Sequence, residues 1–282
     1  IQPGDEVLIV EPSFVCYRPI VSLCGGVPVV IETKEENEFR LTADELREKI
    51  TDKTKLLVLP YPNNPTGAIM RREDLEAVAK VLKDTNIMIA SDEIYSELTY
   101  SGKHCSIAEI EGMRERTIVI NGFSKSFAMT GWRLGFLGGP KEIVSQMLKL
   151  HQYAIMSSPT VSQYAAIVAM HSCQKDIDAM RNEYNIRRRF VVDSFNKLGL
   201  KCFAPQGAFY VFPCIKSTGM TSTDFCEKLV YTKKVAVVPG DAFGECGEGY
   251  VRVSYAYSLN HLREAIKRIG EFLEDIKNGN VQ

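Results

Sequence analysis

The sequence has little net charge, few histidines and only short apolar runs. Its 34 lysines and arginines nearly balance 35 aspartates and glutamates, for a formal net charge of −1, so the charge balance favours neither nucleic acid nor an anionic membrane as a partner. Apolar runs such as Ala165–Met170 fall far short of the roughly 20 residues that span a bilayer. With 45% hydrophobic and 24% charged residues, the chain has the composition of an ordinary globular protein.

Metal-ligand spacing is also lacking. The eight cysteines include no C-x-x-C pair and the four histidines are scattered, which argues against a zinc site. Dispersed cysteines are typical of free thiols in a reducing compartment, so we expect a cytoplasmic protein. A chain of this length can bury a core without disulfides.

What the sequence does contain is an alternation of apolar strands and amphipathic helices. Apolar residues between Leu75 and Leu82 recur at helical spacing, and Thr42 with Glu45 forms a capping-box pattern at the start of a helix over 42–50. The expected strands are Val7–Val10, Val27–Ile31, Leu56–Leu59, Ile87–Ala90, Thr117–Ile120 and Leu134–Leu137. This alternation predicts an α/β fold with a mostly parallel sheet and flanking helices.

A change of pattern near residue 174 predicts a second domain. A long helical stretch from about Lys175 to Leu198 ends at Gly199. Beyond it, the expected strands and final helix are Phe209–Pro213, Val235–Val238, Tyr250–Tyr255 and Leu262–Ile276. We therefore expect a large domain over 1–174, and a linking helix with a smaller α+β domain over 175–282.

Residues with chemical potential follow three consecutive strands. Asn64 follows the first of these strands, and Asp92 and Tyr95 follow the next; Lys125 and then Arg133 follow the third. Ligands of parallel sheets bind beyond the carboxyl ends of the strands, so these residues are expected to meet on one rim. Taken singly, each has a plain explanation as an N-cap, a turn or a solvated lysine, but their convergence favours a site.

The segment Gly122–Gly135 resembles the lysine-attachment signature of class I and II aminotransferases, which depend on pyridoxal 5'-phosphate. Three further segments are similar to landmarks of that family, in the family order: Asn64-Pro-Thr-Gly67, Asp92-x-x-Tyr95 and Tyr250-Val-Arg252-Val-Ser254-Tyr255. The resemblance runs from Pro3 to the C-terminal helix and so covers essentially the whole chain. It implies the fold type I architecture of these enzymes and pyridoxal 5'-phosphate as the cofactor.

The resemblance implies a catalytic group of three residues. Lys125 corresponds to the lysine whose amine forms a Schiff base with the cofactor and then moves the substrate Cα proton. Asp92 corresponds to the carboxylate that keeps the pyridine nitrogen protonated, which makes the ring an electron sink. Tyr95, together with Asn64, corresponds to the pair that hydrogen-bonds the phenolate oxygen of the cofactor.

The same resemblance implies the remaining ligands. Arg133 corresponds to the guanidinium that binds the cofactor phosphate, with Ser124 as a further donor. Phe14 lies where the family has an aromatic ring stacked on the cofactor. Arg252, with Asn64 beside it, is the expected binding site for the α-carboxylate of the substrate.

The implied reaction moves an amino group between an L-amino acid and a 2-oxo acid such as 2-oxoglutarate. The segments 123–133, 150–153 and 207–212 are most similar to a bacterial branch with aspartate, aromatic and N-acetyl-diaminopimelate aminotransferases. We therefore expect an acidic, aromatic or diaminopimelate-type donor. A homodimer is expected because both subunits often build the site in this family. No second arginine for a distal carboxylate is identified in the sequence.

Three alternatives stay open at this point. The same fold and cofactor serve C–S β-lyases, and they also occur in non-catalytic regulatory modules. The third alternative is an inactive fragment. The chain opens at Ile1 without a methionine, whereas the family has a segment before Pro3 with a phosphate-binding loop and one strand of the large sheet. We therefore expect that the large domain lacks its N-terminal part, and that this chain alone binds the cofactor less well.

Overall fold

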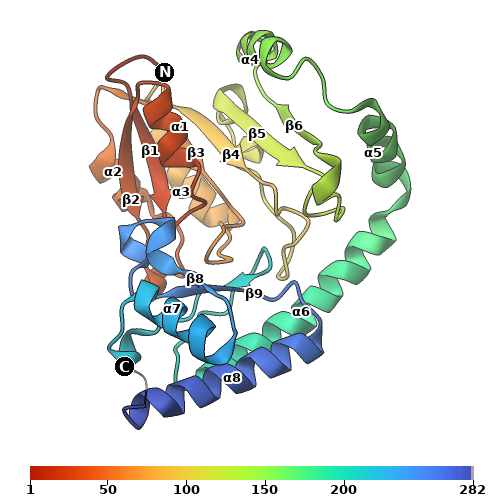
Figure 1. Ribbon diagram of the computed structural model, residues 1–282. Helices are drawn as coiled ribbons and strands as arrows, with labels where there is room; N and C mark the ends of the chain where they lie inside the picture. Colours follow the sequence, from red (N-terminus) through yellow and green to blue (C-terminus); the bar gives the residue numbers. More distant parts are fainter. Residues whose placement is uncertain (281–282) are drawn as a thin grey trace.

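The computed structural model describes residues 1–280, and its first half is built on one sheet (Figure 1). The strand order is β2-β1-β3-β4-β5-β6; all neighbours are parallel except β5 and β6, which are antiparallel. The strands are β1 (Glu6–Glu11), β2 (Val27–Glu32), β3 (Thr54–Leu59), β4 (Met88–Asp92), β5 (Thr117–Gly122) and β6 (Gly135–Gly138). The predicted α/β fold with a mostly parallel sheet is confirmed.

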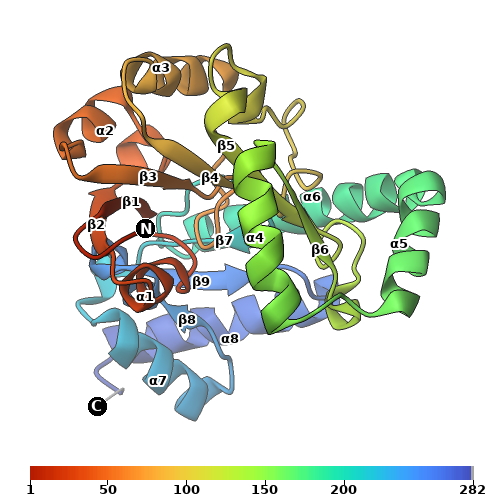
Figure 2. The same ribbon diagram turned by 90° about the horizontal axis from the view of Figure 1, so that it is seen from above.

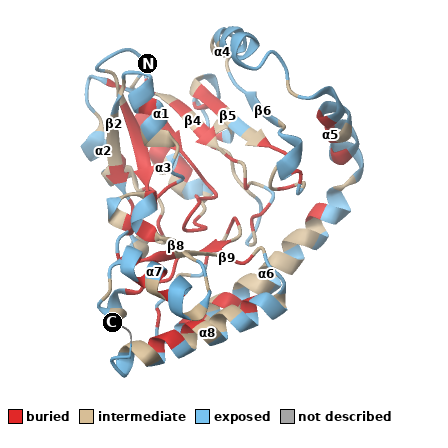
Figure 3. Cartoon of the chain, in the orientation of Figure 1, coloured by how far each residue is buried: buried red, intermediate tan, exposed pale blue. Residues whose placement is uncertain are grey.

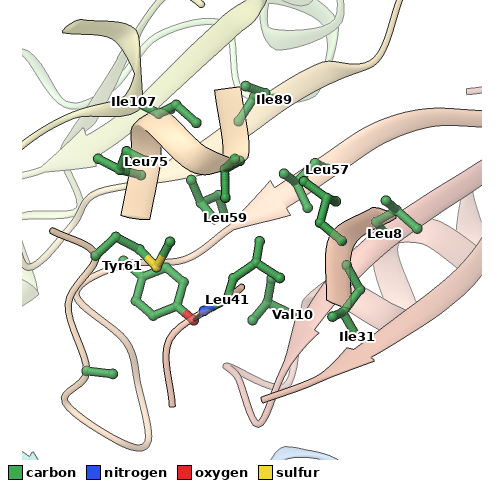
Figure 4. Packing of buried hydrophobic residues seen from close by; sticks show 14 of the residues in the cluster. Leu8, Val10, Ile31, Leu41, Leu57, Leu59, Tyr61, Leu75, Ile89 and Ile107 are labelled. Carbon is green, nitrogen blue, oxygen red and sulfur yellow. Dashed lines mark hydrogen bonds between the residues drawn. The ribbon is translucent and has the colours of Figure 1, made fainter. Parts of the chain in front are cut away.

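The central strands are buried on both faces. In β1, Leu8 and Val10 point into the main core, whereas Val7 and Ile9 point into a smaller cluster on the opposite face. Figure 4 shows Leu8 close to Leu57 of the neighbouring strand in the main core. Burial on both faces explains why these strands are continuous apolar runs rather than alternating ones.

Short helices cover the sheet. They are α1 (Tyr17–Leu23), α2 (Ala43–Lys49) and α3 (Arg72–Leu82). The predicted capping box is present at α2, where the Thr42 side chain accepts from the Glu45 backbone amide and the Glu45 side chain accepts from the Thr42 amide. The apolar side of α3 is buried between Leu75 and Leu82, as its periodicity predicted.

Two further helices, α4 (Lys141–Ala154) and α5 (Thr160–Ser172), are not predicted from the sequence. Helix α4 lies above β5 and β6 in Figure 1, and α5 lies at the outer edge of the molecule (Figures 1 and 2). Figure 3 shows that this edge is mostly exposed, and every residue of β6 is exposed. Large apolar side chains are exposed here, among them Leu150 at 74% and Tyr153 at 94%. Several exposed large apolar side chains on adjoining helices are typical of an interaction face.

The second half of the described chain is built around a small sheet of order β7-β9-β8, with antiparallel neighbours. Its elements, with the helix α6 that precedes them, are α6 (Gln174–Lys197), β7 (Tyr210–Val211), α7 (Ser222–Lys233), β8 (Val238–Pro239), β9 (Val251–Ser254) and α8 (Leu259–Lys277). The predicted strand over 235–238 is largely wrong. Only Val238 and Pro239 pair with β9, so the three residues before them have no partner strand in residues 1–280.

Two hydrophobic cores correspond to the two sheets. One core joins the large sheet to α2 and α3, and the other joins α6, α7 and α8 to the small sheet. Phe212, Phe243 and Tyr250 come from the second half of the sequence but pack in the first core. The two halves are therefore in direct contact. None of the helices in residues 1–280 has the length and apolarity needed to cross a membrane.

Candidate active site

A cavity of about 440 Å³ lies where the carboxyl ends of β3, β4 and β5 face the small sheet. Its size is within the usual range for small-molecule and cofactor sites. It is lined by Phe14, Tyr17, Pro60, Pro62, Asn64, Asp92, Ile94, Tyr95, Ile120, Lys125, Tyr210 and Arg252. Six residues singled out in the sequence therefore meet in one place.

The parallel register explains this convergence. Leu59 at the end of β3 is paired with Ser91 of β4, and Asp92 is paired with Ile120 of β5. The three strands thus end at nearly the same level, and the segments that follow them share one rim. Because of this pairing, Asn64 and Lys125 line the same cavity although they are far apart in the sequence.

Lys125 presents an amine that is easier to deprotonate than an ordinary lysine. Burial lowers its pKa first, and the positive charges of Arg252 and Arg133 lower it further. Its Nζ lies 5.9 Å from the ring centroid of Tyr95 and 5.7 Å from that of Phe209. A partly desolvated amine between aromatic rings is suited to act as a nucleophile or as a base.

Asp92 is held by two hydrogen bonds. The Tyr17 hydroxyl donates to Oδ2 at 2.7 Å, and the Ile94 backbone amide donates to Oδ1 at 3.2 Å. Burial raises the pKa of Asp92, and these two hydrogen bonds oppose that shift. The carboxylate is therefore fixed in orientation inside the cavity, with a strong tendency to bind a positively charged group.

Arg252 offers a buried hydrogen-bond donor to the cavity. Its Nη1 donates to Asn64 Oδ1 at 3.0 Å, and its Cζ lies over the rings of Tyr210 and Phe243, at 4.6 Å and 4.9 Å from their centroids. Its Nε is buried, with no hydrogen-bond acceptor in residues 1–280. A buried donor of this kind is costly unless a ligand accepts from it, and a carboxylate matches the fork.

Asn64 is oriented by this arginine. A guanidinium only donates hydrogen bonds, so the carboxamide oxygen faces Arg252 and the amide donor is left for a ligand. The neighbouring Asn63 has a structural part, because its Oδ1 accepts from the backbone amide and the hydroxyl of Thr66. The Asn64–Pro65 peptide bond is cis.

Tyr95 is buried at the floor of the cavity. Its hydroxyl lies 3.2 Å from the hydroxyl of Tyr210, and the two rings are nearly perpendicular. Burial and then the neighbouring Tyr210 raise its pKa. The phenol is therefore held as a neutral hydrogen-bond donor at ordinary pH.

The remaining predicted residues are placed differently. Phe14 lines the cavity with a 44% exposed side chain. Ser124 and Arg133 are not among the lining residues. The backbone at Arg133 is left-handed with φ of 54°, and its Nη1 donates to the Thr130 carbonyl oxygen. Its charge is nevertheless close enough to lower the pKa of Lys125.

Among the polar lining residues, sequence reasoning missed Tyr17 and Tyr210. Tyr17 follows the carboxyl end of β1, so the strand-end argument applied to the first strand could have found it. Tyr210 lies in 207–212, a segment noted only for its resemblance to one branch of the family. No local sequence signal predicts that its hydroxyl meets Tyr95.

The donor set fits a pyridoxal cofactor. An amine suits its aldehyde, a carboxylate suits its pyridine nitrogen, and Asn64 and Tyr95 offer donors for its phenolate oxygen. The unpartnered donor of Arg252 leaves a place for a substrate carboxylate. The fold and this site define a pyridoxal-phosphate-dependent enzyme.

Within that class, the chain belongs to the family described as aminotransferase class I and II, which matches residues 1–269. An aspartate aminotransferase of Pyrococcus abyssi is 48% identical over 280 residues, which cover 98% of this chain and 72% of that protein. A probable N-acetyl-LL-diaminopimelate aminotransferase of Bacillus subtilis is 47% identical over 273 residues, covering 97% and 69%. The crystal structure of an aromatic aminotransferase from Pyrococcus horikoshii is 47% identical with a TM-score of 0.96, covering 98% of this chain and 75% of that one.

Proposed function

We propose that the chain transfers an amino group between an acidic, aromatic or diaminopimelate-type L-amino acid and a 2-oxo acid such as 2-oxoglutarate. The activities of the relatives named above support these three donor classes. The single observation that carries the proposal is the cavity shared by Lys125, Asp92 and Arg252. It joins an activated amine, a fixed carboxylate and a carboxylate-binding arginine.

The roles proposed for the residues of the cofactor site follow from the contacts of each side chain. Bound pyridoxal phosphate supplies an electron sink for the charge left when the substrate Cα loses its proton. The Lys125 amine is the covalent attachment point and then moves that proton, which its lowered pKa favours. Asp92, oriented by Tyr17, holds a proton on the pyridine nitrogen. Asn64 and Tyr95 donate to the phenolate oxygen.

The phosphate and the ring are assigned to residues at the rim. Arg133 is proposed to bind the phosphate of the cofactor. The support is that its positive charge lowers the pKa of Lys125, which shows that the two side chains are near each other. Ser124 is proposed as a further donor to the phosphate. Phe14 is proposed to stack on the ring, supported by its exposed place in the cavity wall.

Arg252 is proposed to bind the α-carboxylate of the substrate. The support is the position of its guanidinium over two aromatic rings and its buried Nε, which has no acceptor within the described part of the chain. Asn64 contributes by holding Nη1, so it belongs to the substrate site as well. Arg252 and Lys125 line the same cavity, so a substrate held at the arginine shares that space with the amine proposed to remove its proton.

The attachment site is tested by borohydride reduction of the pyridoxal-phosphate-loaded protein, followed by peptide mass spectrometry. We expect a reduced adduct on the peptide that contains Lys125 and none in the Lys125→Ala variant. The matched control is Lys141→Ala at the start of α4, which should leave the adduct intact. An adduct that persists in Lys125→Ala contradicts the assignment.

The reaction is tested with a panel of aspartate, phenylalanine and N-acetyl-LL-diaminopimelate as donors and 2-oxoglutarate as acceptor. We expect glutamate to form in step with the 2-oxo acid of one donor. A C–S β-lyase would instead release pyruvate and ammonia from cystathionine without consuming 2-oxoglutarate. The latter result would overturn the proposed reaction.

We also propose that two copies of the chain associate. The support is the exposed apolar surface of α4 and α5, where Leu150 and Tyr153 project into solvent. An apolar face of this extent on a globular protein is typical of a subunit interface.

A further inference from the structure

Tyr210 occupies an unusual place between two proposed functional groups. Tyr210 is the first residue of β7 and pairs with Ser254 of β9. Arg252 lies two residues before Ser254 on β9, so Tyr210 is close to Arg252. The Tyr210 side chain is almost fully buried, with 7% exposed, yet it lines the cavity. The proposed reaction assigns no role to this side chain.

The ring of Tyr210 fixes one face of Arg252. Its centroid lies 4.6 Å from the Arg252 Cζ, and the centroid of the Phe243 ring lies 4.9 Å from the same atom. Two aromatic faces hold a guanidinium by cation–π attraction and restrict its rotation. The plane of the fork is therefore set before a carboxylate arrives, which lowers the entropy cost of binding.

The hydroxyl of Tyr210 has a separate contact, with the hydroxyl of Tyr95 at 3.2 Å. Each phenol has one proton to donate and lone pairs to accept. Tyr95 can give its only proton to a ligand in the cavity if Tyr210 donates to the Tyr95 oxygen. If the direction is reversed, Tyr95 has no proton left for the ligand.

We propose that Tyr210 is a positioning residue with two separable parts, a ring that orients Arg252 and a hydroxyl that directs the Tyr95 proton into the cavity. The inference rests on the proposed function for the parts played by Arg252 and Tyr95. It links the arginine that binds the substrate carboxylate to the phenol that faces the cofactor oxygen. A chain of hydrogen bonds also makes Tyr95 a stronger donor.

Two substitutions separate the parts. Tyr210→Phe keeps the ring over Arg252 and removes the hydroxyl, whereas Tyr210→Leu removes both. In Tyr210→Phe we expect the pH midpoint of the visible absorbance of the bound cofactor to move upward by about half a pH unit or more. The reason is that a weaker donor at Tyr95 leaves the cofactor oxygen more basic. The KM for the donor identified by the panel should change less than twofold.

In Tyr210→Leu we expect the same shift of the midpoint and also a rise of KM by about 3- to 30-fold, from loss of the cation–π contact. Tyr250→Phe is the matched control, because its hydroxyl contacts Glu35 rather than a group of the cavity. It should move neither quantity. Far-ultraviolet circular dichroism confirms that each variant is folded, and Tyr210→Phe remains informative if Tyr210→Leu is not.

The outcomes are distinguishable from failure of the proposed function. If the Lys125 adduct and the transfer reaction are found but Tyr210→Phe leaves the absorbance midpoint unchanged, the part of the hydroxyl is overturned. If Tyr210→Leu leaves KM unchanged, the part of the ring is overturned. If the adduct lies on another lysine, the proposed function itself fails.

Discussion

Arg252 shows how one residue can combine several contacts that its sequence position does not reveal. Its guanidinium lies over two rings and donates to Asn64, and its buried Nε–H has no acceptor among residues 1–280. The strand β9 fixes only where the backbone of Arg252 lies. The surrounding side chains decide that this arginine is rigid and ready to bind an anion, rather than solvated.

Replacing Arg252 by leucine should weaken donor binding by roughly 2–5 kcal/mol, the usual cost of truncating one partner of a buried charge pair. The measurement is the dissociation constant of the donor, from titration of the cofactor absorbance. Arg47→Leu removes the same charge from an exposed pair with Asp44 and serves as the control. Equal affinities in the two variants would contradict the proposed part of Arg252.

Asp92→Asn should leave the cofactor bound but slow removal of the substrate Cα proton by about 10²–10³-fold, the usual effect of losing one preorganised electrostatic contact. The amide keeps the shape of the carboxylate but cannot hold a proton on the pyridine nitrogen. Single-turnover rates with the loaded protein report this step. A near-normal rate, with Asp44→Asn as the surface control, would count against the assignment.

At the scale of elements, Glu93, the neighbour of Asp92, stabilises the segment after β4 through hydrogen bonds. Its buried carboxylate accepts from Ser91 at 2.8 Å and Ser106 at 2.6 Å, and lies 2.8 Å from His104 Nε2. Burial would raise the pKa of Glu93, but His104 and the two serines lower it below the ordinary value. The carboxylate thus joins 104–106 to the strand end that presents Asp92.

The lowered pKa sets the direction of a pH effect. Glu93 stabilises the fold at pH values above the ordinary glutamate pKa of about 4.3, and this contribution is lost as the pH falls through the lower folded-state pKa. Glu93→Gln should therefore cost about 1–3 kcal/mol of unfolding free energy at neutral pH. The cost should shrink in acid.

Urea unfolding of both proteins at several pH values measures this difference. Glu76→Gln, in an exposed pair with Arg72, is the control and should show little change at any pH. A cost for Glu93→Gln that is the same at neutral and acid pH would argue against ionic stabilisation by Glu93.

At the scale of the whole molecule, the exposed surface is uneven. Several large exposed apolar side chains belong to α4 and α5, and Figure 3 shows α4 and the strand β6 as exposed. Covering such a surface removes apolar area from water at about 25 cal/mol per Å². A second copy of the chain is the proposed cover.

The proposed dimer predicts that Leu150→Glu combined with Tyr153→Glu shifts the chain from dimer to monomer. Two buried charges without partners would oppose the interface. Sedimentation velocity at micromolar concentration measures the state. Tyr231→Glu on α7, which is 75% exposed and lies on the small-sheet half, is the control. A wild-type chain that sediments as a monomer would refute the proposed dimer.

The division into a large domain over 1–174 and a second one over 175–282 stays a prediction. The two hydrophobic cores support it, because each surrounds one of the sheets. Phe212, Phe243 and Tyr250 pack across the predicted boundary into the first core. Limited proteolysis between the two halves is therefore a better test of whether they are separate domains than the position of the long helix.

The sequence by itself determined the order and type of the main elements and the residues at the strand ends. Both rest on local properties, since an apolar run forms a buried strand and a helical period forms a covering helix whatever lies far away. The capping box at Thr42 and the buried face of α3 are correct for this reason. Asn64, Asp92 and Lys125 were found because parallel strands share one rim.

Only the tertiary structure decided which of these side chains touch. The contacts of Tyr17 with Asp92 and of Tyr210 with Tyr95 join residues 75 and 115 positions apart, and they depend on packing angles between elements. The same holds for the exposed place of Arg133 and for the aromatic stack on Arg252. Hydrogen bonds and ring contacts need sub-ångström to ångström placement, which a one-dimensional pattern does not encode.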